Sequence, residues 1–167
     1  QNIIDYNKIH GIGIDRVLGL IGAVETCTPP LITVDCGTAV TINYLDKDYL
    51  CSGGVIFPGP YTQLKSLAEH TEALEETVLK FNEDILAKDT VTAICNGIIY
   101  GIASGIKGMT GQISVENPEK TECPIIITGG GATLLMPAMD KFRIIYKYIE
   151  DLVLKGIYKL LSDCKSF

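Results

Sequence analysis

The chain has 167 residues, a length that corresponds to one domain of ordinary size and suffices to bury a hydrophobic core. Hydrophobic residues make up 47% and charged residues 20%, which excludes a disordered chain, and the longest clear apolar run (17–24) falls short of the ~20 residues of a membrane span. The net charge of −6, with cations scattered along the chain, argues against nucleic acid as a partner, so a polyanionic ligand would need backbone amides or a metal cation.

The first part of the chain is predicted to lead through a helix into three strands. Residues 1–30 are expected to form a loop and then a helix from about 16 to 24. The next segments are short, rich in β-branched and apolar residues, and separated by turn residues, which predicts an antiparallel meander. Its strands are expected at 31–35, 39–44 and 49–56.

Helical periodicity takes over after the meander, at 61–73 and most clearly at 91–109. In the longer helix isoleucines recur every four residues between 94 and 106, so their side chains form one stripe that faces either the core or a dimer partner. The remaining sequence is expected to contain strands at 124–128 and 142–145 and helices at 132–139 and 149–161.

The element order βββ-α-α-β-α-β-α predicts an α/β fold with a mixed sheet and helices against its faces. This order resembles the ribonuclease-H-like half-domain of the actin-like ATPase superfamily. We therefore expect residues 1–30 to form a lead-in segment or hinge, and residues 31–167 to form a ribonuclease-H-like lobe.

The first motif with chemical potential is Asp35-Cys36-Gly37-Thr38-Ala39, at the turn between the first two strands. Glycine lets the backbone approach a ligand, and both the turn amides and the Thr38 hydroxyl can donate to phosphate oxygens. A carboxylate repels phosphate, so Asp35 is explained if a cation lies between the two. The alternative is an ordinary hairpin whose turn begins with an Asp side chain.

A second motif, Gly13-Ile14-Asp15-Arg16, precedes the first helix. Asp15 can act as a general base near an alcohol, and Arg16 can donate two parallel hydrogen bonds to a substrate carboxylate. The same residues serve equally well as a helix start in which Asp15 is the N-cap, and the sequence alone leaves both readings open.

Two glycine-rich segments, 53–59 and 129–131, each lead from a strand toward a helix. Three successive glycines exceed what a turn requires, and they suit a base or ribose against bare backbone or a phosphate at a helix N-terminus. For 53–59 a bulge and a turn explain the glycines equally well. Neither segment has the G-x-G-x-x-G spacing of a dinucleotide site.

Taken in order, these motifs resemble type III pantothenate kinases. The series runs G-x-D-R, D-x-G-T-A, G-G-x-I-x-P-G, a Thr-Val helix start, T-G-G, and a closing helix with an L-x-x-x-G pattern. The resemblance covers nearly the whole chain and implies membership of the acetate and sugar kinase/actin superfamily, in agreement with the element order.

The resemblance implies a role for each matching position. Asp15 would be the general base that takes the proton of the pantothenate hydroxyl, and Asp35 would hold a potassium or ammonium ion. The positions that would bind pantothenate are Tyr6, Gly13, Ile14, Asp15, Arg16 and Thr90, and those that would contact ATP are Gly37, Thr38, Gly129 and Gly130.

The implied reaction is the ATP-dependent phosphorylation of pantothenate to 4′-phosphopantothenate, the first step of coenzyme A biosynthesis. It would use ATP with magnesium and a monovalent cation, in a homodimer with no nucleic-acid or membrane partner. The six cysteines lack zinc-like spacing and are expected to be reduced thiols of a cytoplasmic protein. The alternative function is that of a catalytically inactive relative with a regulatory or binding role.

The sequence departs from the family pattern in three places. No D-x-G-N-T phosphate loop precedes Tyr6, so we expect the N-terminal lobe to lie outside these residues and the fragment alone to be inactive. Asn43 stands where the family usually has Asp, which would weaken the organisation of metal or water. Asp89 replaces the commoner Asn before Thr90, and either adds charge near an anionic substrate or caps a helix.

Overall fold

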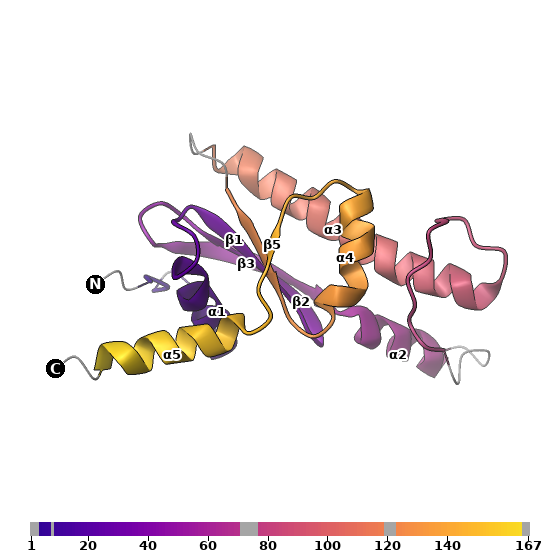
Figure 1. The fold of residues 1–167 in the computed structure, drawn as a ribbon, viewed down its shortest axis with the longest axis horizontal. Helices are drawn as coiled ribbons and strands as arrows, with labels where there is room; N and C mark the ends of the chain where they lie inside the picture. The colour runs from indigo at the N-terminus through magenta and orange to yellow at the C-terminus, as the bar shows by residue number, and fades with distance from the viewer. Residues whose placement is uncertain (1–3, 8, 71–76, 119–122, 165–167) are drawn as a thin grey trace.

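A five-stranded mixed sheet forms the centre of the protein, with helices against both of its faces (Figure 1). The computed structural model describes residues 4–7, 9–70, 77–118 and 123–164. The strand order is β3-β2-β1-β4-β5, which confirms the predicted α/β fold and its leading antiparallel meander. The strands are β1 (Leu31–Cys36), β2 (Ala39–Leu45), β3 (Cys51–Pro58), β4 (Ile125–Thr128) and β5 (Lys147–Tyr148).

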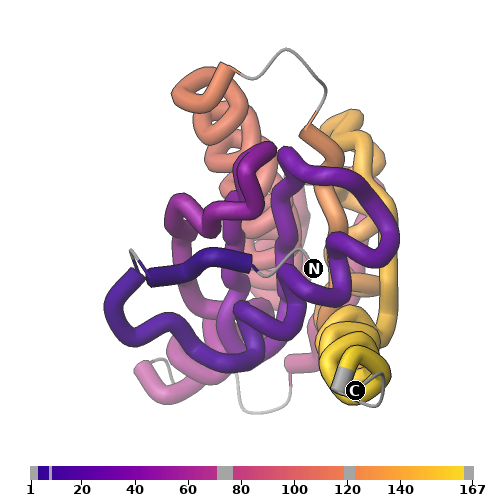
Figure 2. The backbone as a smooth tube through the Cα atoms, turned by 90° about the vertical axis from the view of Figure 1, so that its left-hand side faces the viewer, coloured from indigo at the N-terminus to yellow at the C-terminus, as the bar shows by residue number. Residues whose placement is uncertain are grey.

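The helices form the two outer layers. In Figure 2, which looks onto the end that carries both termini, the salmon tube of α3 and the yellow tube of α5 lie on opposite sides of the strands. No helix in the described ranges is long and apolar enough to cross a membrane. The helices are α1 (Ile14–Val24), α2 (Pro60–His70), α3 (Thr90–Glu116), α4 (Ala132–Lys141) and α5 (Leu152–Cys164).

Alternate residues of β1 face the two sides of the sheet. Ile32 and Val34 are buried in the core that α3 and α4 form with the sheet. Leu31, on the other side, belongs to a second core built with α1 and α5. The next residues on this second side are Thr33 and Asp35, so this face is apolar under α1 and α5 and becomes polar toward the carboxyl end of β1.

Strand β2 repeats this change from apolar to polar because it lies antiparallel to β1 with opposed residues in register. On the other side β4 is parallel to β1 and places Thr128 beside Asp35. The polar region therefore extends across three strands at one end of the sheet. The β1–β2 pairs on this face are Leu31 with Leu45, Thr33 with Asn43 and Asp35 with Thr41.

Helices α1 and α5 touch backbone to backbone at two glycines. A Cβ atom at Gly156 would overlap the carbonyl oxygen of Leu18, and one at Gly22 would overlap the carbonyl oxygen of Leu152. Gly156 is the glycine of the closing L-x-x-x-G pattern. In this structure the pattern permits the close crossing of the two helices.

The isoleucine stripe of α3 lies in the core, because Ile98, Ile102 and Ile106 are buried in the cluster that includes the inner residues of β1 and α4. The helix extends beyond the predicted 91–109 and reaches Glu116. It crosses one face of the sheet and extends beyond it toward α2 (Figure 1).

The predicted strand at 142–145 is wrong, and the fifth strand forms at Lys147–Tyr148 instead. The amides of Phe142 and Ile144 donate back to carbonyls near the end of α4, so they are not available to a sheet. Arg143 has a φ of +56°, which interrupts any extended conformation. The segment is a helix end, and Ile145 is 91% exposed.

Candidate active site

The polar end of the sheet is built from three turns that pack against one another. The β1–β2 turn, residues 36–39, lies between the other two. The Gly59 amide donates to the carbonyl of Thr38 over 2.8 Å, and the Gly131 amide donates to the carbonyl of Cys36 over 2.7 Å. The predicted ATP-side segments, distant in sequence, therefore meet at the carboxyl end of β1.

Gly129 lies directly against Asp35. Its φ of +94° is in a region that favours glycine. A Cβ atom there would overlap the Asp35 carboxylate and would lie 2.7 Å from backbone atoms of Cys36. The first glycine of the triplet is thus required for the approach of this turn to β1, whereas Gly130 has open space beside it.

Asp15 is exposed in the first turn of α1, where a carboxylate interacts favourably with the helix dipole. The N-cap is Gly13, which makes no side-chain cap, so the alternative reading of Asp15 as the N-cap is wrong. A Cβ atom at Gly13 would overlap the Asp15 carboxylate. The glycine before the helix therefore makes room for this carboxylate.

The Asp15 and Asp35 carboxylates interact electrostatically. Burial raises the pKa of Asp35, and the nearby Asp15 carboxylate raises it further. Two adjacent carboxylates, one of them partly buried, favour a cation between them, and oxygen donors suit a hard cation. In the described part of the chain no three His, Cys, Asp or Glu side chains gather into a metal site, so this pair has no third ligand of these kinds.

The thiol next to Asp35 is not a nucleophile. Burial raises the pKa of Cys36 to about 12, and the Asp35 carboxylate contributes to the rise. Thiolate is the reactive form, so Cys36 remains an inert thiol at neutral pH.

Arg16 extends from α1 onto the polar end of the sheet, where its Nε donates to Asn43 Oδ1 over 2.6 Å. Asn43, which stands where the family usually has Asp, uses its side-chain amide to contact Arg16 and Thr33. The alternation of Thr33 and Asp35 along β1, combined with the register of β2, is the signal that could have placed Asn43 beside the predicted site.

Of the other predicted pantothenate positions, Ile14 lies beside Asp15, whereas Tyr6 lies away from Asp15, Arg16 and Asp35. Ile14 precedes Asp15 on α1 and is 69% exposed. The backbone of Asp5 bonds to Tyr49 and Cys51, which places Tyr6 near the start of β3, at the opposite end of that strand from Gly59.

Thr90 is not brought together with the cluster. It is the first residue of α3, whose N-terminal end lies at the opposite end of the molecule from α1 (Figure 1). Asp89 is the N-cap, and its carboxylate accepts a hydrogen bond from the Thr92 amide over 2.9 Å. This hydrogen bond lowers the pKa of Asp89, which confirms the helix-cap reading of that residue.

The loop before Thr90 is tied to α3 through its carbonyl oxygens. The Tyr100 hydroxyl lies 2.7 Å from the carbonyl oxygen of Asn82 and 3.0 Å from that of Glu83. The Asn96 amide nitrogen lies 2.8 Å from the carbonyl oxygen of Asp84 and 3.1 Å from that of Ile85. Side chains of α3 thus fix the path of this loop.

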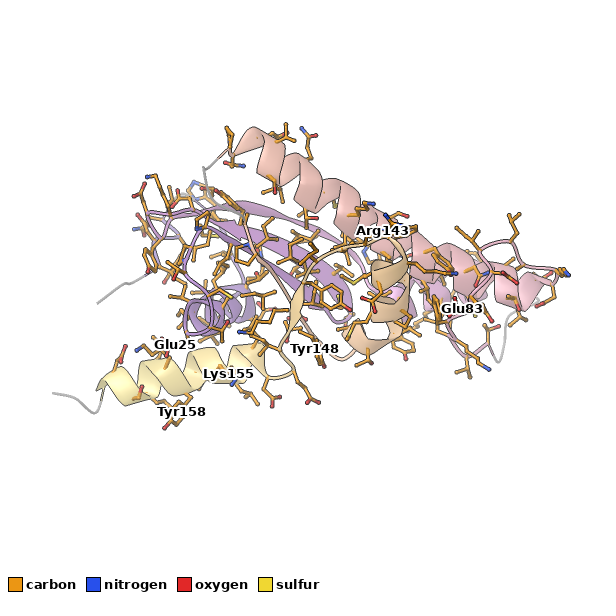
Figure 3. All side chains as sticks on the ribbon, turned by 45° about the horizontal axis from the view of Figure 1, so that its top comes forward. Glu25, Glu83, Arg143, Tyr148, Lys155 and Tyr158 are labelled. Atoms are coloured by element: carbon orange, nitrogen blue, oxygen red, sulfur yellow. The ribbon has the colours of Figure 1, made fainter. Side chains whose placement is uncertain are left out.

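Two surface hollows lie away from the polar end of the sheet. One, of about 410 Å³, is lined by Glu83, Tyr100 and Lys141 among others, and one of about 570 Å³ is lined by residues of α5 and by Glu25. Figure 3 shows Glu83 near one end of the molecule, and Glu25 and Tyr158 at the other. No predicted site residue lines either of these two hollows.

The sequence of this chain is similar to those of known proteins that share these motifs. The sequence profile described as type III pantothenate kinase matches residues 3–112. The chain belongs to the type III pantothenate kinase family. It is 35% identical over 164 residues to a type III pantothenate kinase of Nitrosococcus oceani, covering 95% of this chain and 59% of that protein. It is 36% identical over 149 residues to one of Synechococcus elongatus, covering 89% and 59%. The chain therefore spans about three-fifths of the length of these relatives in the type III pantothenate kinase family.

Solved structures support the fold assignment within this family. A Campylobacter jejuni protein assigned to the Baf family of transcriptional activators matches with a TM-score of 0.68 at 22% identity, over 99% of this chain and 71% of that one. The activator of a Clostridium difficile 2-hydroxyisocaproyl-CoA dehydratase, solved with bound ADPNP, matches with a TM-score of 0.55 at 13% identity, over 85% and 62%. At these identities the likeness concerns the fold alone.

Proposed function

We propose that the protein that contains this chain transfers the γ-phosphoryl group of ATP to pantothenate, and that it is a cytoplasmic enzyme of coenzyme A biosynthesis. The observation that carries the proposal is the meeting of Asp15, Arg16 and Asp35 at one end of the sheet in a member of this family. Phosphoryl transfer depends on positioning and charge neutralisation more than on covalent chemistry, and a polar sheet end with two carboxylates and one arginine suits that requirement.

Each residue has a distinct role in this proposal. The exposed Asp15 accepts the proton of the pantothenate hydroxyl, and Arg16 binds the pantothenate carboxylate. Asp35 holds the potassium or ammonium ion, which reduces the repulsion between this acidic site and the phosphates. Thr38, Gly37, Gly129 and Gly130 line the nucleotide side. Magnesium bound to ATP supplies the further charge neutralisation that the few basic residues leave unmet.

The proposal includes a second lobe and a second copy of the chain. The D-x-G-N-T phosphate loop is expected in a lobe outside these residues, in keeping with the three-fifths of the relatives that the chain spans. Thr90 begins α3, whose N-terminal end lies at the opposite end of the molecule from α1 (Figure 1), so a contact between Thr90 and a pantothenate bound at Asp15 requires a partner in a homodimer.

A kinase assay on the full-length gene product tests the function. Turnover is expected with pantothenate and ATP and is expected to be faster with potassium. Asp15→Asn is expected to lower kcat at least about 100-fold, the usual contribution of a general base. The matched control is Asp48→Asn, which changes an exposed carboxylate in the β2–β3 turn.

The possible results separate the two candidate functions. Absence of turnover with and without potassium would favour the inactive relative over the kinase. Normal turnover of Asp15→Asn would leave the kinase standing and reject Asp15 as its base.

A further inference from the structure

Helix α5 carries a row of large apolar side chains on its outer side. Leu154, Tyr158 and Leu161 are 60%, 75% and 58% exposed. Their spacing of four and then three residues places them along one side of the helix, with the exposed Ile157 beside them. We name these four residues the α5 stripe. Figure 3 shows Tyr158 pointing away from the sheet.

The inner side of α5 is held largely by backbone contact with α1. Leu152, at the start of the helix, is buried in the second core. One turn later, Gly156 lies against the carbonyl oxygen of Leu18. A glycine has no side chain to bury, so this part of the crossing contributes little apolar area from α5. The large apolar side chains that follow in the helix are all exposed, and they are Ile157, Tyr158, Leu160 and Leu161.

The hollow of about 570 Å³ borders the α5 stripe. Leu154 and Tyr158 line it together with charged and polar residues of α5 and of the segment that follows α1. Among the charged residues, Lys159 forms ion pairs with Glu25 and with Asp163, each over 3.4 Å. An apolar centre that includes a tyrosine, next to a polar rim, is the usual composition of a protein–protein interface.

The second lobe of the proposed kinase is the occupant that fits this surface. The chain spans about three-fifths of the length of its relatives, so a lobe of the remaining size is large enough to cover a whole helix. Helix α5 extends to the end of the molecule that carries both termini (Figures 1 and 2). A lobe attached at that end has a high effective concentration at the stripe. The second copy of the chain is required instead at the other end, where Thr90 begins α3.

We propose that the second lobe of the full-length protein docks an apolar surface on the α5 stripe and covers the adjacent hollow. This inference rests on the function proposed above, which includes that lobe. Helix α5 then lies between the lobe and α1, the helix whose first turn carries Asp15. The crossing of α1 and α5 thereby fixes the position of the lobe relative to the Asp15 carboxylate.

Hydroxyl-radical footprinting of the full-length protein tests the contact without any substitution. Side-chain oxidation is mapped by peptide mass spectrometry, and each rate is divided by the intrinsic reactivity of its residue type. The references are Ile145 and Val115, which are 91% and 72% exposed. The corrected rates at Tyr158 and Leu161 are expected to be at least about fivefold lower than at the references, because the core of an interface is packed like a protein interior.

A charge substitution identifies what covers the stripe. Tyr158→Asp places a carboxylate in the apolar contact, which is unfavourable, so Leu154 and Leu161 are expected to lose their protection from oxidation. The molar mass measured by light scattering should stay that of the unmodified protein. Ile145→Asp is the matched control and is expected to change neither the protection nor the mass. If Tyr158→Asp does not fold, Leu161→Ser takes its place, with Leu154 and Tyr158 as the reporters.

Three results would overturn the inference. Corrected rates at the stripe equal to those of the references would show that the stripe stays in solvent. A halved molar mass in Tyr158→Asp would show that a second copy of the chain, and not the lobe, covers it. Protection that survives the substitution would show that the covering contact does not involve the stripe. Since none of these measurements needs turnover, a protected stripe in a protein that does not phosphorylate pantothenate would reject the proposed function alone.

Discussion

The two faces of the sheet differ in how their residues are used. On the face toward α3 and α4, inner residues such as Ile32 and Val34 are apolar and buried. On the other face only the part beneath α1 and α5 is apolar. Toward the carboxyl end of β1 this face carries Thr33 and Asp35 together with their β2 partners, and is polar. Since neighbouring residues of one strand face opposite sides, β1 supplies the core with one set of side chains and the candidate site with the other. Stability and chemistry can therefore be perturbed separately in this strand.

The largest expected effect is on the covered face. Ile102→Ala removes a buried side chain from α3 and is expected to lower the free energy of unfolding by about 3 to 4 kcal/mol, because it leaves a cavity. Urea unfolding measures this loss, and kcat of the remaining folded protein should be unchanged. Leu86→Ala is the control, since Leu86 is 85% exposed. A fall in kcat without a loss of stability would contradict the separation of the two faces.

The next largest effect is expected on kcat, from a change at the polar end of the sheet. Asp35→Asn is expected to lower kcat about 100-fold, because charge neutralisation at the phosphates is lost. Potassium should then no longer change the rate. Steady-state kinetics with and without potassium measure both effects, with Asp163→Asn on α5 as the control. A variant that still responds to potassium would place the cation elsewhere.

Two helix glycines test the close crossing of α1 and α5, which covers the apolar part of the second sheet face. Gly156→Ala forces α5 away from α1 and is expected to destabilise the protein by about 2 kcal/mol. Gly101→Ala, on α3 with open space around it, is expected to stabilise it by about 0.5–1 kcal/mol through helix propensity. Thermal unfolding compares the two variants. Equal shifts would mean that the α1–α5 contact is not close.

The smallest expected effect is a pH dependence. The pKa of Asp35 is raised above its ordinary value of 3.8, so the folded protein binds this proton more tightly than the unfolded chain does. Stability is then lost as pH rises from 3.8 through the raised pKa, because the ionised carboxylate is disfavoured in the folded state. Asp35→Asn avoids this loss.

The melting temperature of Asp35→Asn should therefore exceed that of the unmodified protein near neutral pH and should approach it at about pH 3. Potassium should reduce the difference by stabilising ionised Asp35. Asp48→Asn, at an exposed position, is the control. A difference that is constant with pH would show that Asp35 titrates normally.

The elements that were predicted correctly have local signals. The meander is marked by β-branched runs between turn residues, and α3 is marked by isoleucines four residues apart. The fifth strand was misplaced because residues 142–145 have strand-like composition. The end of α4 competes with strand formation there, because its carbonyl oxygens accept hydrogen bonds from the amides of Phe142 and Ile144.

The residues of the candidate site also fall into those with a local sequence signal and those without one. Asp15, Arg16 and Asp35 were selected from short motifs, and the structure brings them to one end of the sheet. The contact of Asn43 with Arg16 depends on the register of the strands and on where α1 crosses them. Those relations are not local, so Asn43 could not be assigned to Arg16 from its neighbours in the sequence.

The loop that leads to Thr90 has a consequence for hydrogen exchange. Tyr100 and Asn96 hold its carbonyl oxygens between Asn82 and Ile85 and do not engage the amide hydrogens of these residues. Amides that face solvent exchange readily even where the backbone keeps its position. We therefore expect the amides of this loop to take up deuterium rapidly although the loop atoms show small displacements. Hydrogen exchange and atomic displacement would together describe a loop that is ordered but not protected from exchange.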